Sequence, residues 1–290
     1  MKKSILCVVL LSFIAIIAYQ FKPVKEVSQV ISNSITNSNG YINTEGKTVK
    51  ERITIPDGFK RVAYAKGSFQ DYIRHYKLKP FGAKVINYDG SPYFNQIGHF
   101  GILEVPVPEN GLQQCADALI RLRSEYLWEQ NRKNDIGFNF TSGHNCSWTK
   151  YAEGYRPKIN GNKVIFSKTA TANHSKANFY KYLNLIYMYS GTISLFSELP
   201  KINDVNKLKI GDMLIIGGSP GHVVMIADVI EDEAGKKYFA LLQGNTPAQS
   251  VHLLKNLEHN KISPWYKLKL GDQIEIPGYT FYDAKFVRFK

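Results

Sequence analysis

Two cysteines and a histidine are the residues of this sequence whose types best suit covalent chemistry. His222 lies where the turn segment GGSPG gives way to the apolar run HVVMIADV, and Cys115 and Cys146 lie upstream of it. A cysteine hydrolase needs a thiol near the start of a helix, because the helix dipole and a nearby imidazole favour the thiolate. A histidine at the start of a strand could be the base for such a thiol, or it could simply bond a turn carbonyl.

A catalytic imidazole also needs a third polar group that orients its ring. Gln243 and Asn245 end the segment FALLQGN, which follows the histidine strand. Either side chain could reach the nitrogen of His222 that faces away from the thiol. The sequence therefore predicts a Cys-His-polar triad, with His222 as the general base and Gln243 or Asn245 as the orienting residue.

The choice of nucleophile stays open between the two thiols. Cys146 stands in NCSW, ahead of a short helical pattern, whereas Cys115 lies several residues inside a predicted helix and on its apolar stripe. A free cysteine on such a stripe behaves as a small hydrophobic residue. His99, at the start of GHFGILEV, offers a second pairing with Cys146. In an exported chain the two cysteines could instead form one disulfide.

The elements that must position these residues are predicted by hydrophobic periodicity. Apolar residues at helical spacing predict a long helix in residues 111–130 and a second helical region from Ser175, interrupted near Gly191. In the last third, the runs MLII, HVVMIADVI, KKYFALLQG and SVHLL alternate with turn segments, which predicts an antiparallel meander. Helices followed by a meander indicate an α+β domain.

The N-terminal segment indicates export. Lys2 and Lys3 precede the apolar run ILCVVLLSFIAIIAY, which is typical of a signal-peptide core and short for a spanning helix. Residues 1–21 are therefore expected to be a signal peptide or an uncleaved membrane anchor. Residues 22–52 are rich in Ser, Asn and charge and are expected to form a flexible tether. Residues 53–290 would be a single domain, in the periplasm or anchored in the inner membrane facing it.

The formal net charge of +13 bears on possible partners. A basic balance suits nucleic acid, an anionic membrane surface or an anionic polymer. The sequence holds no dense Lys/Arg run and no nucleic-acid-binding motif. We therefore expect peptidoglycan or another anionic envelope polymer as a partner, no nucleic acid, and membrane contact only through the N-terminal segment.

No cofactor and no metal are expected, because the His and Cys spacings match no known metal site and the glycines of GGSPG precede no helix. Asp212 and Asp228 could be paired acids. The simpler interpretation is that Asp212 fixes a turn and Asp228 ends a strand.

Two resemblances add to this reading. The segments GDMLII, GHVVMIADV and FALLQGN, between Gly211 and Asn245, resemble the second half of NlpC-type and CHAP-type peptidoglycan hydrolases. NCSW looks like the start of the NlpC-type nucleophile helix. This resemblance implies a papain-like fold, with helices packed on an antiparallel sheet. It also implies a cysteine hydrolase that cleaves an amide bond, such as one in a peptidoglycan peptide.

The second resemblance covers most of the chain beyond the tether. The ordered motifs LKPFGA, LQQCADALIRLRSEYL, FTSG, GDMLIIGGSPGHVVMIADV and SPWY resemble the bacterial envelope family named domain of unknown function 4846. That family implies an envelope protein with no established activity. Its pattern holds Cys115 and both strand-start histidines but varies after FTSG, which favours Cys115 over Cys146. The alternative function is a non-catalytic binding or scaffold protein on a degenerate papain-like fold.

Overall fold

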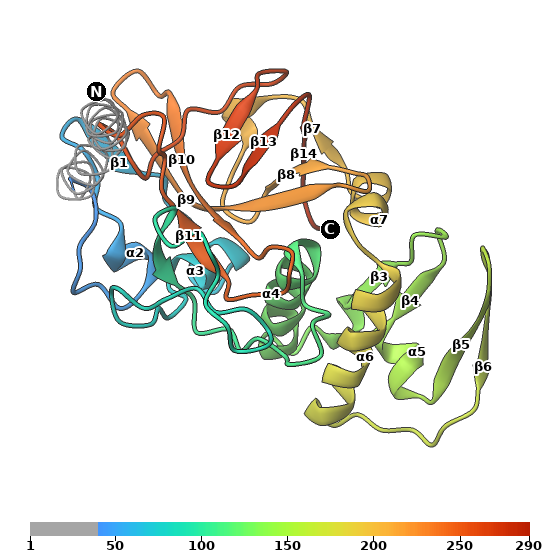
Figure 1. Cartoon of the computed structure of the whole chain (residues 1–290). Coiled ribbons are helices and arrows are strands. Elements are labelled where there is room, and N and C mark those ends of the chain that lie inside the picture. Colours follow the sequence, from blue (N-terminus) through green and yellow to red (C-terminus); the bar gives the residue numbers. More distant parts are fainter. Residues whose placement is uncertain (1–39) are drawn as a thin grey trace, which may run out of the picture. The chain divides into compact units, whose positions relative to one another are not determined.

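An eight-stranded sheet, antiparallel throughout, is the centre of the fold (Figure 1). The computed structural model describes residues 40–290, and the unit that carries the sheet begins at Tyr41. Four consecutive strands form its middle: β8 (Met213–Ile216), β9 (His222–Asp232), β10 (Lys237–Gln243) and β11 (His252–Leu254). The predicted meander is therefore confirmed, and with it the α+β class.

Short strands from before and after the meander in the chain extend it at its edges. The pairs are β1 (Phe59–Arg61) with β9, β2 (His99–Ile102) with β11, β14 (Lys285–Val287) with β8, and β7 (Lys201–Ile202) with β14. A separate hairpin of β12 (Ile274–Ile276) and β13 (Tyr279–Phe281) comes late in the chain. The aromatic rings of this hairpin reach the start of β9, as described below.

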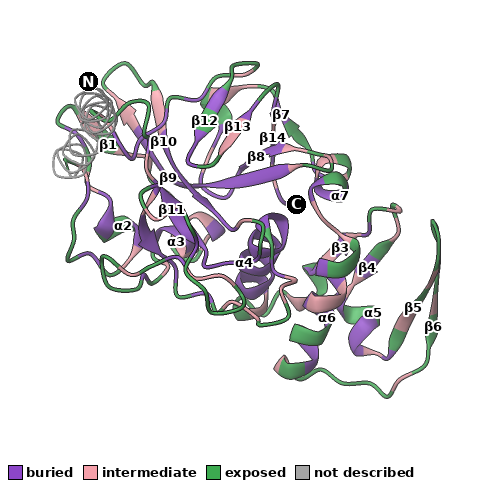
Figure 2. Ribbon diagram, viewed as in Figure 1, coloured by how far each residue is buried: buried purple, intermediate pink, exposed green. Residues whose placement is uncertain are grey.

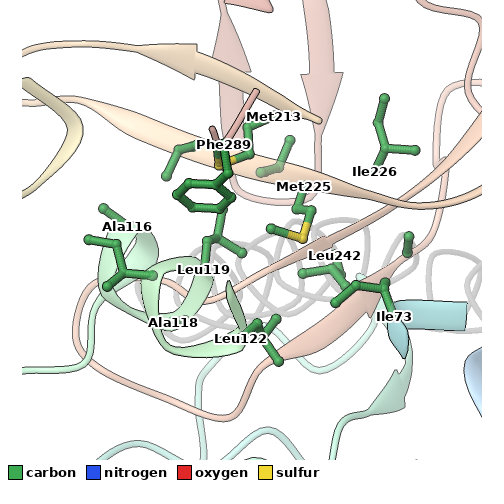
Figure 3. Close-up of a cluster of buried hydrophobic side chains, with 14 of the residues drawn as sticks. Ile73, Ala116, Ala118, Leu119, Leu122, Met213, Met225, Ile226, Leu242 and Phe289 are labelled. Atoms are coloured by element: carbon green, nitrogen blue, oxygen red, sulfur yellow. The ribbon is translucent and has the colours of Figure 1, made fainter. Parts of the chain in front are cut away.

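The helix α4 (Cys115–Glu129) packs against β9 and β10. Leu119 and Leu122 of this helix meet Met225 and Leu242 of the sheet in a common core (Figure 3). Burial is not confined to one face, because thirteen of the fifteen residues of α4 are buried (Figure 2). The buried charges on α4 are partly paired, as in the 2.9 Å ion pair of Arg121 with Glu125.

The other helices are short or lie further from the sheet. They are α2 (Val49–Arg52), α3 (Phe69–Arg74), α5 (Trp148–Ala152), α6 (Lys176–Tyr189) and α7 (Thr192–Glu198). The break between α6 and α7 at Gly191 confirms the predicted interruption. No helix in residues 40–290 is long and apolar enough to cross a membrane. The predicted leader lies outside the described residues.

Residues 137–189, called here the α5–α6 region, carry two hairpins beside the helices. The hairpins are β3 (Gly137–Asn139) with β4 (Asn145–Ser147) and β5 (Tyr155–Asn160) with β6 (Lys163–Lys168). Aromatic packing holds the region to α4, because the ring centroid of Trp128 lies 4.6 Å from that of Phe179 and 5.6 Å from that of Trp148. The region is attached to the sheet through α4 and α7.

The compact unit begins earlier than the sequence predicts. Residues 41–52, expected to belong to the tether, include the buried Ile42 and the helix α2. Thr48 and Glu51 form a capping box at the start of α2, which satisfies helix N–H groups that would otherwise lack partners. The Ser- and Asn-rich composition of the preceding segment hid this short signal.

Asp228 does not end a strand, and it is not paired with Asp212. It lies within β9 with its side chain fully buried, and it bonds Arg61 at 2.8 Å and Arg74 at 2.6 Å. Asp212 accepts a hydrogen bond from the backbone N–H of Lys209, as expected for a turn, and it is paired with Arg288. Each acid is therefore neutralised by arginine, which makes both of them structural.

Candidate functional site

Cys115 is the first residue of α4, not an interior residue as the sequence suggested. The preceding residue, Gln114, is extended, and its backbone N–H donates to the side chain of Asp117 at 3.0 Å. This bond starts the helix at Cys115, where the first backbone N–H groups have no partners within the helix. The thiol therefore stands at the positive end of the helix dipole.

The start of α4 packs closely on the end of β10. A Cβ built on Gly244 would lie 2.7 Å from the Cβ of Ala118 and 3.6 Å from the Cα of Cys115. Only a glycine allows this approach, because a methyl group at the first distance would overlap the helix. Gly244 follows Gln243 directly, so the predicted orienting residue and Cys115 belong to one neighbourhood.

The Cys115 thiol is buried, and its burial governs its acidity. Burial raises the pKa of the thiol to about 11, and the nearby Asp117 carboxylate adds to this effect. The backbone N–H groups of Ala116, Val223 and Cys115 itself act in the opposite direction. Because Val223 follows His222 on β9, the thiol lies against the start of the histidine strand.

His222 is held by the residue at the end of the neighbouring strand. The Nε2 of His222 and the Oε1 of Gln243 are 2.8 Å apart, in a bond buried from solvent. Burial lowers the pKa of His222, so the ring is neutral near pH 7. Nδ1, the other ring nitrogen, makes no hydrogen bond within residues 40–290, and it is not one of the fully buried atoms without a partner. It therefore keeps some contact with solvent.

An aromatic pair from β13 covers the His222 ring. Tyr279 and Phe281 lie 4.7 Å and 5.7 Å from it, measured between ring centroids. The pKa of Tyr279 is raised by burial and then by the negative charge that Cys115 would carry, so the phenol lies within electrostatic range of the thiol. The three groups Cys115, His222 and Tyr279 thus converge from α4, β9 and β13.

The hydrogen bonds continue beyond Gln243. The Nε2 of Gln243 is 3.2 Å from the Nε2 of His252, and the Nδ1 of His252 is 2.8 Å from the carbonyl oxygen of Ser250. Burial lowers the pKa of His252 to about 4. His99, the other strand-start histidine, faces His252 at 5.9 Å between ring centroids and bonds the carbonyl oxygen of Ala83.

The remaining predicted residues lie away from the His222 ring. Asn245 bonds the hydroxyl of Tyr93 at 3.3 Å, so Gln243 and not Asn245 holds His222. Cys146 lies in β4, opposite Phe138 in the α5–α6 region, and the helix α5 begins only at Trp148. Burial raises the pKa of the Cys146 thiol to about 12. Both cysteines are free, so the alternative of a disulfide between them is wrong.

The resting site contains neutral groups. Within residues 40–290 no hydrogen bond joins the Cys115 thiol to His222. The raised pKa of the thiol and the lowered pKa of the imidazole leave the thiol protonated and the imidazole uncharged at neutral pH. Such a site can act by proton transfer from thiol to imidazole when a substrate arrives. In the same part of the chain no group of three or more His, Cys, Asp or Glu residues could hold a metal ion.

Sequence reasoning missed two residues of this cluster, His252 and Tyr279. His252 stands alone in SVHLL, a pattern that gives no sign of contact with Gln243. Its place follows from the pairing of β11 with β10, in which Gln243 is opposite His252. Tyr279 belongs to a hairpin outside the main sheet, and nothing in its local sequence predicts that it covers His222.

Together these features define an α+β protein with a buried cysteine, histidine and glutamine gathered where a helix start meets two strand ends. The chain belongs to the family described as domain of unknown function (4846), whose model matches residues 49–288. The match includes α4, the whole meander and the β12–β13 hairpin. No curated protein and no solved structure gives a significant match.

Proposed function

We propose that the protein is a cell-envelope cysteine hydrolase that cleaves an amide bond, with Cys115 as nucleophile, His222 as general base and Gln243 as orienting residue. One observation carries the proposal. A cysteine at the first residue of a long helix lies against a strand whose first residue is a histidine, and that histidine is held at 2.8 Å by a glutamine. This is the arrangement expected of a papain-like hydrolase, in accord with the NlpC-type resemblance of residues 211–245.

The proposed reaction begins with proton transfer. Nδ1 of His222 takes the proton of the Cys115 thiol, and the sulfur attacks the substrate carbonyl carbon. The free N–H groups at the start of α4 are suited to stabilise the oxyanion that forms. The imidazolium then gives its proton to the leaving amine as the C–N bond breaks. Water, activated by His222, hydrolyses the acyl-enzyme and restores the thiol.

The proposed substrate is a peptide bond of peptidoglycan. The N-terminal lysines and apolar run favour export to the periplasm or anchoring in the inner membrane, and the net charge of +13 favours an anionic envelope polymer. The NlpC-type resemblance favours a peptide link over a glycosidic one. No paired carboxylates occupy the candidate site, and the buried acids Asp212 and Asp228 are neutralised by arginine.

The test is release of new amino ends from purified peptidoglycan by the protein and by His222→Ala. We expect the wild type to release them and His222→Ala to lose activity by at least about a thousandfold, because the general base is absent. His259→Ala is the matched control, since His259 is exposed and lies outside the site. Equal activity of His222→Ala and wild type, or no release by the wild type, would contradict the proposal.

The alternative is a non-catalytic envelope binding protein. The burial that raises the pKa of the Cys115 thiol to about 11 favours it, because an inert buried cysteine has this property. Under this alternative, wild type, Cys115→Ala and His222→Ala would bind peptidoglycan equally and none would cleave it. Sedimentation with insoluble peptidoglycan, run beside the hydrolysis assay, separates the two functions.

A further inference from the structure

The hydrogen bonds behind His222 have a defined direction. The carbonyl oxygen of Ser250 can only accept, so Nδ1 of neutral His252 must carry its proton and donate across the 2.8 Å contact. Nε2 of His252 is then an acceptor. The group of Gln243 that faces it at 3.2 Å must be the amide N–H.

The orientation of the Gln243 amide in turn fixes the direction of its hydrogen bond to His222, the candidate base. With its nitrogen facing His252, Gln243 presents its oxygen to His222 at 2.8 Å. An amide oxygen can only accept, so Nε2 of His222 must carry the proton. The other nitrogen, Nδ1, is therefore unprotonated, which is the form required to accept a proton from a thiol.

Burial keeps water from competing for these hydrogen bonds and so from changing which group donates and which accepts. Gln243 and His252 are 1% and 3% exposed, so solvent cannot supply substitute partners. The titratable groups that act on His252 are His222 and, on β2, His99. The positive charge of Lys255 in turn lowers the pKa of His99. Both histidines disfavour a positive charge on His252. With burial, they lower the pKa of His252 to about 4, which keeps the ring neutral at neutral pH.

Reversal of the hydrogen bonds from His252 through Gln243 to His222 would disable the base. If His252 offered an N–H to Gln243, the amide would have to turn its oxygen toward His252 and its nitrogen toward His222. Nε2 of His222 would then become the acceptor, and Nδ1 would carry the proton. A neutral His222 in that form has no free nitrogen on the side away from Gln243.

We propose that His252 is a positioning residue that fixes, through Gln243, the tautomer of His222 and so leaves Nδ1 as the basic nitrogen. The consequence for catalysis rests on the proposed hydrolase function. The tautomer itself does not, because it follows from the hydrogen-bond directions alone.

The test measures the tautomers directly, by ¹⁵N NMR of the histidine rings at neutral pH. We expect the wild type to show His222 protonated at Nε2 and His252 protonated at Nδ1. His252→Leu removes the acceptor for Gln243, so His222 should populate both tautomers. His252→Gln is the matched variant, because a glutamine oxygen can replace Nε2 as acceptor and should restore the wild-type tautomer.

Hydrolysis supplies the second readout. We expect His252→Leu to lower kcat on peptidoglycan by about 10- to 100-fold with KM nearly unchanged, because only proton transfer is impaired, and His252→Gln to recover most of the rate. A wild-type His222 protonated at Nδ1, or a single Nε2–H tautomer that persists in His252→Leu, would overturn the proposal. Absence of wild-type hydrolysis would instead overturn the proposed function, and the NMR result would still decide the role of His252. Should His252→Leu fail to fold, the wild-type and His252→Gln spectra decide it.

Discussion

The two cysteines of the described chain lie in different structural settings, one at the start of a helix and the other in the middle of a short strand. Cys115 is the first residue of a fifteen-residue helix and lies against the start of a histidine strand. Cys146 is the middle residue of a three-residue strand that pairs with β3, and its backbone carbonyl accepts a hydrogen bond from the hydroxyl of Tyr182. Both thiols are buried, and burial raises both pKa values.

The comparison shows that burial alone does not distinguish a candidate nucleophile from a packing residue. What differs is the set of polar groups around each sulfur. Backbone N–H groups from α4 and β9 oppose the rise in the pKa of Cys115. At Cys146 the group that opposes the rise in the pKa is the charge of Arg156, and the phenols of Tyr151 and Tyr182 lie within electrostatic range of the thiol. Position at a helix start, next to a second element, is therefore the feature to test.

The largest expected effect separates the two cysteines by activity. Cys115→Ala should lower peptidoglycan hydrolysis by at least about a thousandfold, because the nucleophile is absent. Cys146→Ala should leave the rate unchanged. Each variant removes one buried sulfur and should cost about 1 kcal/mol of the free energy of unfolding, so urea denaturation should show similar stabilities. Loss of activity in Cys146→Ala, with activity kept in Cys115→Ala, would reverse the assignment.

A smaller effect should follow from moving the Cys115 end of α4 while keeping its chemistry. Gly244→Ala places a methyl group 2.7 Å from Ala118, so the helix start must shift away from β10. We expect hydrolysis to fall about 10- to 100-fold, because displacements near 1 Å at a catalytic group have that cost. Stability should fall by about 1–3 kcal/mol, the usual cost of overpacking.

Gly191→Ala is the control for this substitution. No atom lies within 4 Å of a Cβ built on Gly191, and its φ of 174° suits any residue. The expected result is an unchanged rate and a stability within about 0.5 kcal/mol of wild type. A fully active Gly244→Ala protein would mean that the close approach of α4 to β10 does not position the thiol.

The sequence predicts the sheet better than the helix start. Alternating apolar runs and turns suffice for β8 to β11, and because His222 begins β9 and Gln243 ends the antiparallel β10, their contact follows from topology. The start of α4 was missed because glutamine is an unusual cap and Asp117, three residues later, supplies the bond instead. Partners far apart in the chain, such as Arg74 with Asp228 or Gln243 with His252, leave no local pattern.

The smallest expected effect on the chemistry of the site concerns the carboxyl group beside the Cys115 thiol. Burial raises the pKa of Asp117 to about 7, and its negative charge raises that of the thiol. Asp117→Asn removes the charge but keeps an oxygen for the Gln114 N–H. At pH 8, where Asp117 is ionised, the variant thiol should react with iodoacetamide about two- to fivefold faster. At pH 5, where Asp117 is protonated, the two proteins should react alike.

The same substitution should change how stability depends on pH. The folded-state pKa of Asp117 lies above its usual 3.8, so the folded protein binds the extra proton between about pH 4 and pH 7. Wild-type stability should therefore decrease as the pH rises through that window, while Asp117→Asn avoids this loss. The variant's advantage should be absent below pH 4 and level off above pH 7 at about 2–4 kcal/mol. Asp272→Asn, at an exposed site, should show no such trend, and a thiol of unchanged reactivity in Asp117→Asn would mean that the local charge does not control Cys115.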